Sequence, residues 1–291
     1  MGQRQRVKGV LQLYSLRCGD KSVILDCPKI MGIINVTPDS FFDGGKFYSH
    51  STPSLEKIEL EAEAMIGGGA TFLDIGGSSS RPGAEVIGAS EEIERVLPVV
   101  ECLAQLPVTL SVDTFHAKTA KAVLEVGADV INDISGGRDP QMFEVIADSD
   151  CAYVIMHMQG NPQNMQKNPT YSNVVAEVKE YLEKKVEDLE RIGVCRSRLI
   201  VDPGFGFGKT FEHNIKLFKT LESFRSMGMP LLVGLSRKSF LGEIVGRDVN
   251  ERLQASVTAA VLAVKQGANI VRVHDVIQTF DGLMTLRALS D

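Results

Sequence analysis

The sequence lacks the features that mark a multidomain, fibrous or membrane protein. Its 291 residues contain no Pro- or Ser-rich spacer, no low-complexity tract and no block of like charges, so no linker between domains is indicated. No apolar run approaches the ~18 residues that a transmembrane helix needs. Residues 1–6 include no apolar signal segment and no serine or threonine at the myristoylation position. We therefore expect a cytoplasmic protein without a membrane partner.

Cysteine and histidine patterns typical of metal sites are also missing. The 5 cysteines are scattered, with no C-x-x-C pair, and no H-x-x-x-H or H-E-x-x-H spacing occurs around His157. We expect reduced thiols that mostly pack in the core, and we assign no role to His157. The net charge of −6 argues against nucleic acid or an anionic membrane as the main partner.

The sequence does contain a regular alternation of short apolar runs and helix-length segments. Eight runs rich in β-branched residues each end in polar, glycine or cationic residues: Lys29–Ile34, Thr71–Ile75, Val108–Val112, Ala128–Ile131, Ala152–Met156, Arg198–Val201, Leu231–Leu235 and Ile270–Val273. Between them lie segments with helical apolar spacing, such as Leu55–Ile66, Glu91–Leu103 and Val174–Ile192. The alternation predicts an α/β fold, a single-domain (β/α)8 TIM barrel over residues 29–291.

Residues 1–28 precede the first predicted barrel strand. Two alternating segments, Val10–Tyr14 and Ser22–Leu25, flank Cys18-Gly19-Asp20 and predict a β-hairpin. We expect this hairpin to cap the N-terminal face of the barrel, because the opposite face carries the chemistry in TIM barrels.

Hydrogen-bond acceptors end three of the predicted strands. These are Asp113, Asn132 and Asp202. A single aspartate at a strand end could be only the N-cap of the next helix. Three acceptor-bearing side chains at one barrel mouth suit a flat heterocycle with several N–H donors side by side, such as an aminopyrimidinone.

Cations end the last two predicted strands, in Ser236–Ser239 and Arg272–Asp275. They could be a solvated cluster, but TIM barrels often hold phosphate groups in the loops after these strands. The Gly/Ser-rich loop 76–83 contains Arg81 and could be either a flexible connection or a second anion site. Loop 35–45 carries Phe41 and Phe42, which favour a lid over a plain surface turn.

The segment 202–210 resembles a nucleotide-binding loop but departs from both common patterns. Pro203 stands where the first glycine of G-x-x-x-x-G-K-[ST] belongs, and Gly208 comes one residue too early for G-x-G-x-x-G. A loop that lets its backbone and Phe207 approach a flat ring is the better interpretation.

Seven motifs in chain order together resemble those of one family. They are Gly32–Phe41, Ser111–Thr114, Ile131–Ile134, Met156–Gly160, Asp202–Lys209, Ser236–Ser239 and Arg272–Asp275. The family is dihydropteroate synthase, the folate-pathway enzyme that sulfonamides inhibit, and the resemblance runs from about Ile30 to the C-terminus. It implies condensation of 6-hydroxymethyl-7,8-dihydropterin pyrophosphate with p-aminobenzoate, with release of pyrophosphate, and a homodimer formed through barrel helices.

The resemblance also implies roles for individual residues. The pterin would be bound by Asp113, Asn132, Asp202 and Lys238, in a pocket lined by Met156, Phe207 and Gly234. Mg²⁺ would be the cofactor and Asn35 its ligand. The pyrophosphate would be held by Ser80, Arg81, Arg272 and His274, and the p-aminobenzoate by Phe41, Arg81, Pro82, Lys238 and Ser239. The catalytic residues would be Asn35, Asp43, Arg81, Lys238, Arg272 and His274.

The loop after the second strand departs from the family pattern Gly-Gly-Glu-Ser-Thr-Arg-Pro-Gly. Ser78 replaces the glutamate and Ser80 replaces the threonine. Ser80 keeps the hydroxyl and loses a methyl group, so contact with an anion should survive with a looser rotamer. The order of the loop, the affinity for p-aminobenzoate and the sulfonamide response are the properties this change puts in question.

Two other functions stay open. Methyltetrahydrofolate:corrinoid methyltransferases share a pterin-binding barrel, but they have no pyrophosphate for the cations Lys238 and Arg272 to serve. A catalytically silent pterin-binding paralogue is the second alternative. The intact loop 35–45 together with Arg81 and His274 argues against it.

Overall fold

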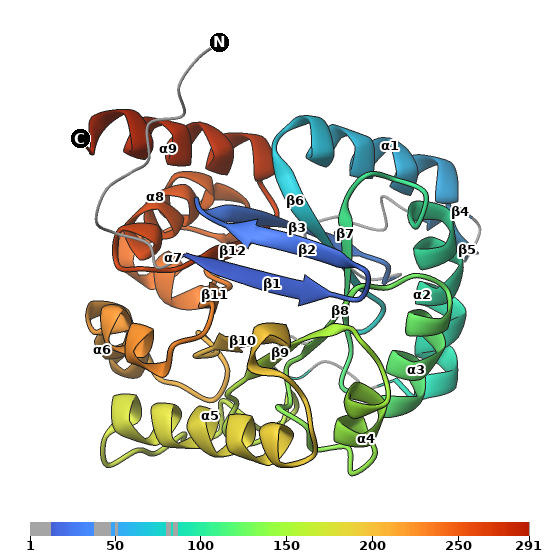
Figure 1. The fold of residues 1–291 in the computed structure, drawn as a ribbon. Coiled ribbons are helices and arrows are strands. Elements are labelled where there is room, and N and C mark those ends of the chain that lie inside the picture. Colours follow the sequence, from blue (N-terminus) through green and yellow to red (C-terminus); the bar gives the residue numbers. More distant parts are fainter. Residues whose placement is uncertain (1–12, 38–47, 50–51, 80–82, 84–86, 291) are drawn as a thin grey trace.

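The computed structural model describes residues 13–37, 48–49, 52–79, 83 and 87–290. Eight parallel strands of this part form one sheet in the order β10-β9-β8-β7-β6-β3-β12-β11. A parallel bridge between Val201 and Leu231 links β10 to β11, so the sheet closes on itself. Helices surround this barrel (Figure 1). The predicted TIM barrel is confirmed.

The barrel strands are β3 (Lys29–Asn35), β6 (Ala70–Gly76), β7 (Thr109–Asp113), β8 (Val130–Asp133), β9 (Ala152–Met156), β10 (Leu199–Asp202), β11 (Leu232–Val233) and β12 (Ile270–Val273). The helices are α1 (Leu55–Gly67), α2 (Ala89–Leu103), α3 (Ala117–Glu125), α4 (Met142–Ala147), α5 (Val174–Arg191), α6 (Phe211–Lys219), α7 (Ser239–Val245), α8 (Leu253–Lys265) and α9 (Val276–Leu289). Two short strands, β4 (Tyr48–Ser49) and β5 (Thr52–Pro53), pair antiparallel before α1. The predicted helices correspond to α1, α2 and α5, with only their end residues shifted.

An antiparallel hairpin of β1 (Tyr14–Cys18) and β2 (Lys21–Leu25) lies across one end of the barrel, as Figure 1 shows. Its second strand agrees with the prediction, but the first does not. The predicted first segment, Val10–Tyr14, meets the observed strand only at Tyr14, and its residues 10–12 lie outside the described residues; Cys18 pairs with Lys21 and leaves only Gly19 and Asp20 in the turn. That tight turn, with Gly19 at φ +60°, places Tyr14 opposite Leu25 and moves the strand along the chain.

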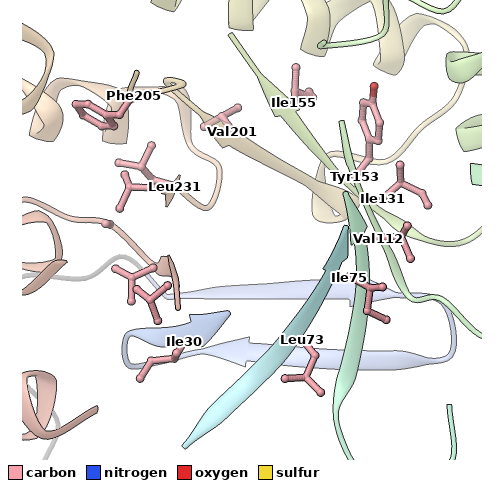
Figure 2. Packing of buried hydrophobic residues seen from close by; sticks show 14 of the residues in the cluster. Ile30, Leu73, Ile75, Val112, Ile131, Tyr153, Ile155, Val201, Phe205 and Leu231 are labelled. Carbon is pink, nitrogen blue, oxygen red and sulfur yellow. The ribbon is translucent and has the colours of Figure 1, made fainter. Parts of the chain in front are cut away.

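Alternation along each strand divides the buried residues into two sets. One set points outward and packs under the helices; it includes Ile30, Leu73, Ile75, Val112, Ile131, Tyr153, Ile155, Val201 and Leu231 (Figure 2). The other set fills the lower barrel together with the hairpin and contains Leu16, Cys18, Leu25, Met31, Phe72, Val130, Ala152, Val154, Ile200, Leu232 and Ile270. The hairpin therefore shares a core with the barrel interior and closes the end at which the strands begin.

Strand β6 shows how the interior changes from apolar to polar along the barrel. Phe72 packs with the hairpin, whereas Asp74, two residues further on and therefore on the same face, is fully buried among polar partners. The interior turns polar toward the carboxyl ends of the strands. Within the described part of the chain, no helix is both long and apolar enough to span a membrane.

Candidate active site at the carboxyl ends of the strands

A cavity of about 450 Å³ opens where the barrel strands end. Most of the predicted site residues line it: Asn35, Asp113, Asn132, Met156, Asp202, Phe207, Gly234, Lys238, Ser239, Arg272 and His274. The other predicted residues, Phe41, Asp43, Ser80, Arg81 and Pro82, lie outside the described residues. The fold thus brings to one place side chains that are up to 239 positions apart in sequence, since Asn35 and His274 both border the cavity.

A buried carboxylate that the sequence analysis did not single out lies at the base of this cavity. Asp74 is 0% exposed and accepts hydrogen bonds from Ser111 Oγ at 2.5 Å, Asn132 Nδ2 at 3.0 Å and Arg272 Nε at 2.5 Å. Because Asn132 and Arg272 are thereby held in place, Asp74 orients two of the predicted ligand-binding residues. In the sequence, Asp74 could have been noticed as the single charged residue inside the apolar run Thr71–Ile75.

Arg272 connects Asp74 to Asp113. Its Nη2 lies 2.8 Å from Asp113 Oδ2, while its Nε contacts Asp74. Burial acts to lower the pKa of Arg272, but Asp74 and Asp113 outweigh it and raise that pKa. Burial raises the pKa of Asp113 to about 7, although Arg272 opposes the shift. The pocket therefore holds a carboxyl group poised to ionise near neutral pH and a guanidinium that stays charged.

Asp202 and Lys238 also line the cavity. Asp202 Oδ1 accepts a hydrogen bond of 2.7 Å from the Gly204 N–H. Burial raises the pKa of Asp202 to about 6, against the Gly204 N–H and the charge of Lys238. Lys238 Nζ lies 4.0 Å from the centroid of the Phe207 ring, and burial and Arg272 lower its pKa to about 8. A flat ring placed here would contact an aromatic face and a carboxylate together.

The loop after β11 separates its two cations by backbone geometry. Arg237 has φ +57°, which is costly for a residue with a side chain, and its guanidinium pairs with Asp275 at 2.8 Å. Its Nη1 also donates to the Val249 carbonyl at 3.0 Å. Arg237 is thus bound to the helix layer behind the loop, and Lys238 contacts Phe207 in the cavity. Both cations border the cavity, but the Arg237 guanidinium is already paired with Asp275.

Asn35 and His274 border the side of the cavity near the first and last strands. His274 Nδ1 lies 3.0 Å from Ser236 Oγ. Ser78 and Ser79, from the loop whose sequence differs from the family pattern, line the same cavity. Within residues 13–37, 48–49, 52–79, 83 and 87–290, no cluster of three or more His, Cys, Asp or Glu side chains could hold a metal ion. The Asn35 amide oxygen fits Mg²⁺, which prefers oxygen ligands and usually needs few from the protein when substrate phosphates supply the rest.

Lys209 does not face the cavity, as the phosphate-binding lysine of a nucleotide loop would. The residue is 2% exposed, and its ammonium group lies between carbonyl groups of its own loop and His157 Nδ1, at 2.9 Å from the latter. The rejection of a nucleotide loop therefore agrees with the geometry, and sequence reasoning missed Lys209 because only the fold buries it.

Known proteins resemble this chain over nearly its whole length. A family model described as "Pterin binding enzyme" matches residues 31–274. The dihydropteroate synthase of Escherichia coli K12 is 44% identical over 268 residues, covering 92% of this chain and 93% of that one. The Yersinia pestis dihydropteroate synthase with a sulfonamide drug superimposes with a TM-score of 0.90 at 40% identity, covering 94% of this chain and 98% of that chain. The Burkholderia cenocepacia enzyme complexed with 7,8-dihydropteroate gives a TM-score of 0.86 at 41% identity, covering 96% and 97%.

Proposed function

The chain belongs to the dihydropteroate synthases, a family of pterin-binding transferases, and we propose how its residues carry out the reaction. The observation that carries the proposal is the convergence of Asp113, Asn132 and Asp202 in one cavity beside Lys238 and Phe207. The relative with bound dihydropteroate supports dihydropterin pyrophosphate and p-aminobenzoate as the substrates.

The pterin ring is placed with its N–H edge toward the carboxylates. Asp113 and Asp202 accept hydrogen bonds from the ring, Asn132 adds a further contact, and Lys238 donates a hydrogen bond to the ring. Apolar contacts come from Met156 and the Phe207 ring, and Gly234 leaves room for the heterocycle. Buried carboxylates facing N–H donors give specificity, because an analogue without those donors leaves the charges unpaired.

The reaction breaks the bond between the pterin methylene carbon and the pyrophosphate oxygen. The pyrophosphate leaves with the electron pair of that bond. Arg272 and His274, with Ser80 and Arg81 of the loop, stabilise the leaving anion. The aniline nitrogen of p-aminobenzoate then forms a C–N bond with the pterin-methylene cation and releases a proton to solvent. Mg²⁺ held by Asn35 would neutralise pyrophosphate charge when bound. The p-aminobenzoate is held by Phe41, Arg81, Pro82, Lys238 and Ser239, and closure of these loops, with Asp43, excludes water.

Arg272 has two roles in this scheme. Its contacts with Asp74 and Asp113 keep it in the barrel, and its charge opposes protonation of Asp113. It therefore supports pterin binding as well as pyrophosphate departure.

The direct test is dihydropteroate formation from both substrates, measured with and without Mg²⁺. We expect product only with both substrates and a rate that rises with Mg²⁺. Asn35→Asp keeps an oxygen ligand whereas Asn35→Ala removes it, so the Mg²⁺ concentration for half-maximal rate should rise in the alanine variant alone. Pterin binding without product would identify a silent paralogue. Methyl transfer from methyltetrahydrofolate to a corrinoid would identify the other alternative.

The homodimer is proposed from an exposed apolar face on α9. Ile277, Phe280 and Met284 are 54%, 40% and 43% exposed and lie on one side of the helix. Such a contiguous patch is uncommon on a monomer and typical of an interface. Sedimentation of the wild type should give a dimer, and Met284→Asp should give a monomer; a monomeric wild type would contradict the proposal.

A further inference from the structure

Lys209 and His157 form a buried pair directly behind the cavity. The Lys209 ammonium nitrogen lies 2.8 Å from the Gly204 carbonyl oxygen, 3.0 Å from the Phe207 carbonyl oxygen and 2.9 Å from His157 Nδ1. The His157 carbonyl oxygen is a longer contact at 3.3 Å. The three N–H donors of an ammonium group thus have acceptors on two segments, the end of β9 and the loop after β10.

This pairing identifies His157 as an acceptor. Because Nδ1 accepts from Lys209, the ring proton belongs on Nε2. Burial and the charge of Lys209 lower the pKa of His157 to about 2, so the ring stays neutral. The ring also packs edge-on against Tyr181, with centroids 4.9 Å apart. His157 thus serves as a fixed neutral support for Lys209.

The loop 204–208 is shaped to turn its carbonyl groups toward Lys209. Gly204 and Gly208 both have positive φ, at +71° and +61°, where a side chain is strained. A Cβ at Gly204 would also collide with the His157 carbonyl, and one at Gly208 with the Gln159 carbonyl. The loop therefore lies against the end of β9 with no space between them, and the ammonium group joins the two.

The opposite side of this loop presents the groups assigned to the pterin. The Gly204 N–H donates to Asp202 Oδ1 at 2.7 Å, and the Phe207 ring lies under Lys238. The Gly206 N–H donates to Asn214 Oδ1 at 2.8 Å, which ties the middle of the loop to α6. Gly204 directs its carbonyl to Lys209 and its N–H to Asp202, and Phe207 directs its carbonyl to Lys209 and its ring to Lys238, so Lys209 sets the position of both pterin contacts.

We propose that Lys209 is a positioning residue for the pterin: its ammonium group joins loop 204–208 to His157 and places a positive charge behind Asp202. The proposal rests on the proposed function, in which Asp202 and Phe207 hold the ring. Lys209 itself is separated from the cavity by the loop and touches no substrate.

The charged groups around Asp202 come from several elements. Lys238 and Arg272 face it from the cavity side, with Asp113 beyond Arg272, and Lys209 faces it from behind, with neutral His157 as its neighbour. Burial raises the pKa of Asp202, and these three cations act against it. Burial lowers the pKa of Lys209, whereas Asp202 raises it. Removing the Lys209 charge therefore moves the pKa of Asp202 further upward.

Two substitutions separate the hydrogen bonds of Lys209 from its charge. Lys209→Met removes both, whereas Lys209→Gln keeps two N–H donors and loses the charge. The matched control is Lys216→Met, the same change on an exposed lysine of α6. For each variant we measure kcat and KM for both substrates from pH 5 to 9, together with the melting temperature.

Lys209→Met should raise the KM for the pterin pyrophosphate by ~10-fold or more and leave the KM for p-aminobenzoate within about twofold. The acid limb of kcat/KM for the pterin should move to higher pH by roughly half a unit to one unit. Lys209→Gln should show the same movement of the acid limb with a smaller rise in KM. A role limited to fold stability would lower the melting temperature and leave the position of the acid limb unchanged.

If folded Lys209→Gln keeps the wild-type KM for the pterin pyrophosphate and the wild-type acid limb of kcat/KM, the role of the charge is overturned. The same result in Lys209→Met would overturn the whole proposal. If Lys209→Met does not fold, Lys209→Gln decides, because it keeps donors for the carbonyls. Failure of the proposed function looks different, since wild type and Lys216→Met would then also form no dihydropteroate.

Discussion

The two ends of the barrel are built from the same eight strands and have opposite interiors. At the end where the strands begin, Met31, Phe72 and Ile200 pack with the hairpin into an apolar core. At the end where they finish, Asp113, Asp202 and Arg272 surround a cavity of about 450 Å³. Burial stabilises the first end, whereas at the second it raises the pKa of the carboxyl groups and works against their charged forms. Apolar burial at the first end therefore stabilises the folded state and offsets the cost of burying the charged groups that bind the ligand at the second end.

The comparison predicts that stability and binding can be changed separately. The largest expected effect is on the closed end. Phe72→Ala should lower the free energy of unfolding by about 3–5 kcal/mol, because it leaves a cavity in a fully buried apolar layer. The KM values of the folded enzyme should change little, and Leu60→Ala, at a site 60% exposed, is the control. Denaturant unfolding with parallel kinetics measures both; a large rise in pterin KM would show that the two ends are coupled.

The next largest effect concerns the open end. Asp202→Asn should weaken pterin pyrophosphate binding by roughly 10- to 100-fold, equivalent to about 1–3 kcal/mol, because the amide places a donor against the N–H edge of the ring. The amide oxygen can still accept from Gly204 N–H, so the melting temperature should not fall. Calorimetry of binding and thermal unfolding test this, with the exposed Asp148→Asn as the matched control. Unchanged affinity would remove Asp202 from the pterin site.

A smaller effect is expected from pH. The pKa values of Asp202 and Asp113 are raised to about 6 and about 7, so the ionised forms that accept the pterin N–H groups are lost as pH falls through this range. Between pH 7 and pH 6, kcat/KM for the pterin should fall by about tenfold. Folding responds with the opposite sign: a raised carboxyl pKa makes the folded state bind protons more readily, so these groups lower stability as pH rises from about 4 to 7. In Asp202→Asn, the pH profiles of kcat/KM and of the free energy of unfolding should each lose part of this dependence. Profiles identical to those of the wild type would contradict the assignment of Asp202.

The smallest effect should come from the rim of the closed end. Arg17 of the hairpin forms an ion pair of 2.8 Å with Asp150, but the two side chains are 53% and 66% exposed. Arg17→Ala should therefore lower the free energy of unfolding by less than about 1 kcal/mol and leave all kinetics unchanged. A loss comparable to that of Phe72→Ala would mean that the hairpin is held by its charges and not by its apolar face.

Much of this organisation could be predicted from the sequence. The alternation of β-branched runs with helical spacing indicates the barrel, because strands and helices require different periods of apolar residues. Polar residues at the ends of the runs indicate the open end, because parallel strands finish on one side of the sheet. Asp113, Asn132 and Asp202, which end three of these runs, line one cavity for this reason.

Other features could not be predicted from local sequence. The first hairpin strand continues to Cys18, beyond the predicted segment, because its register depends on the two-residue turn at Gly19 and Asp20. Asp74 was missed, and its main partner Arg272 is 198 residues away. Pairings over such distances depend on which residues the closed sheet places in one layer, and strand periodicity carries no information about that.

The sequence by itself thus determined the number of the barrel strands and their order along the chain, the side of the barrel that carries polar groups, and the family of the protein. Only the tertiary structure decided what each cation does. Arg237 pairs with Asp275 in the helix layer, Arg272 joins two carboxylates, Lys238 lies over Phe207, and Lys209 is buried behind the pocket. The physical reason is that a cation acts through the groups within a few ångströms of it, and closure of the barrel selects those groups.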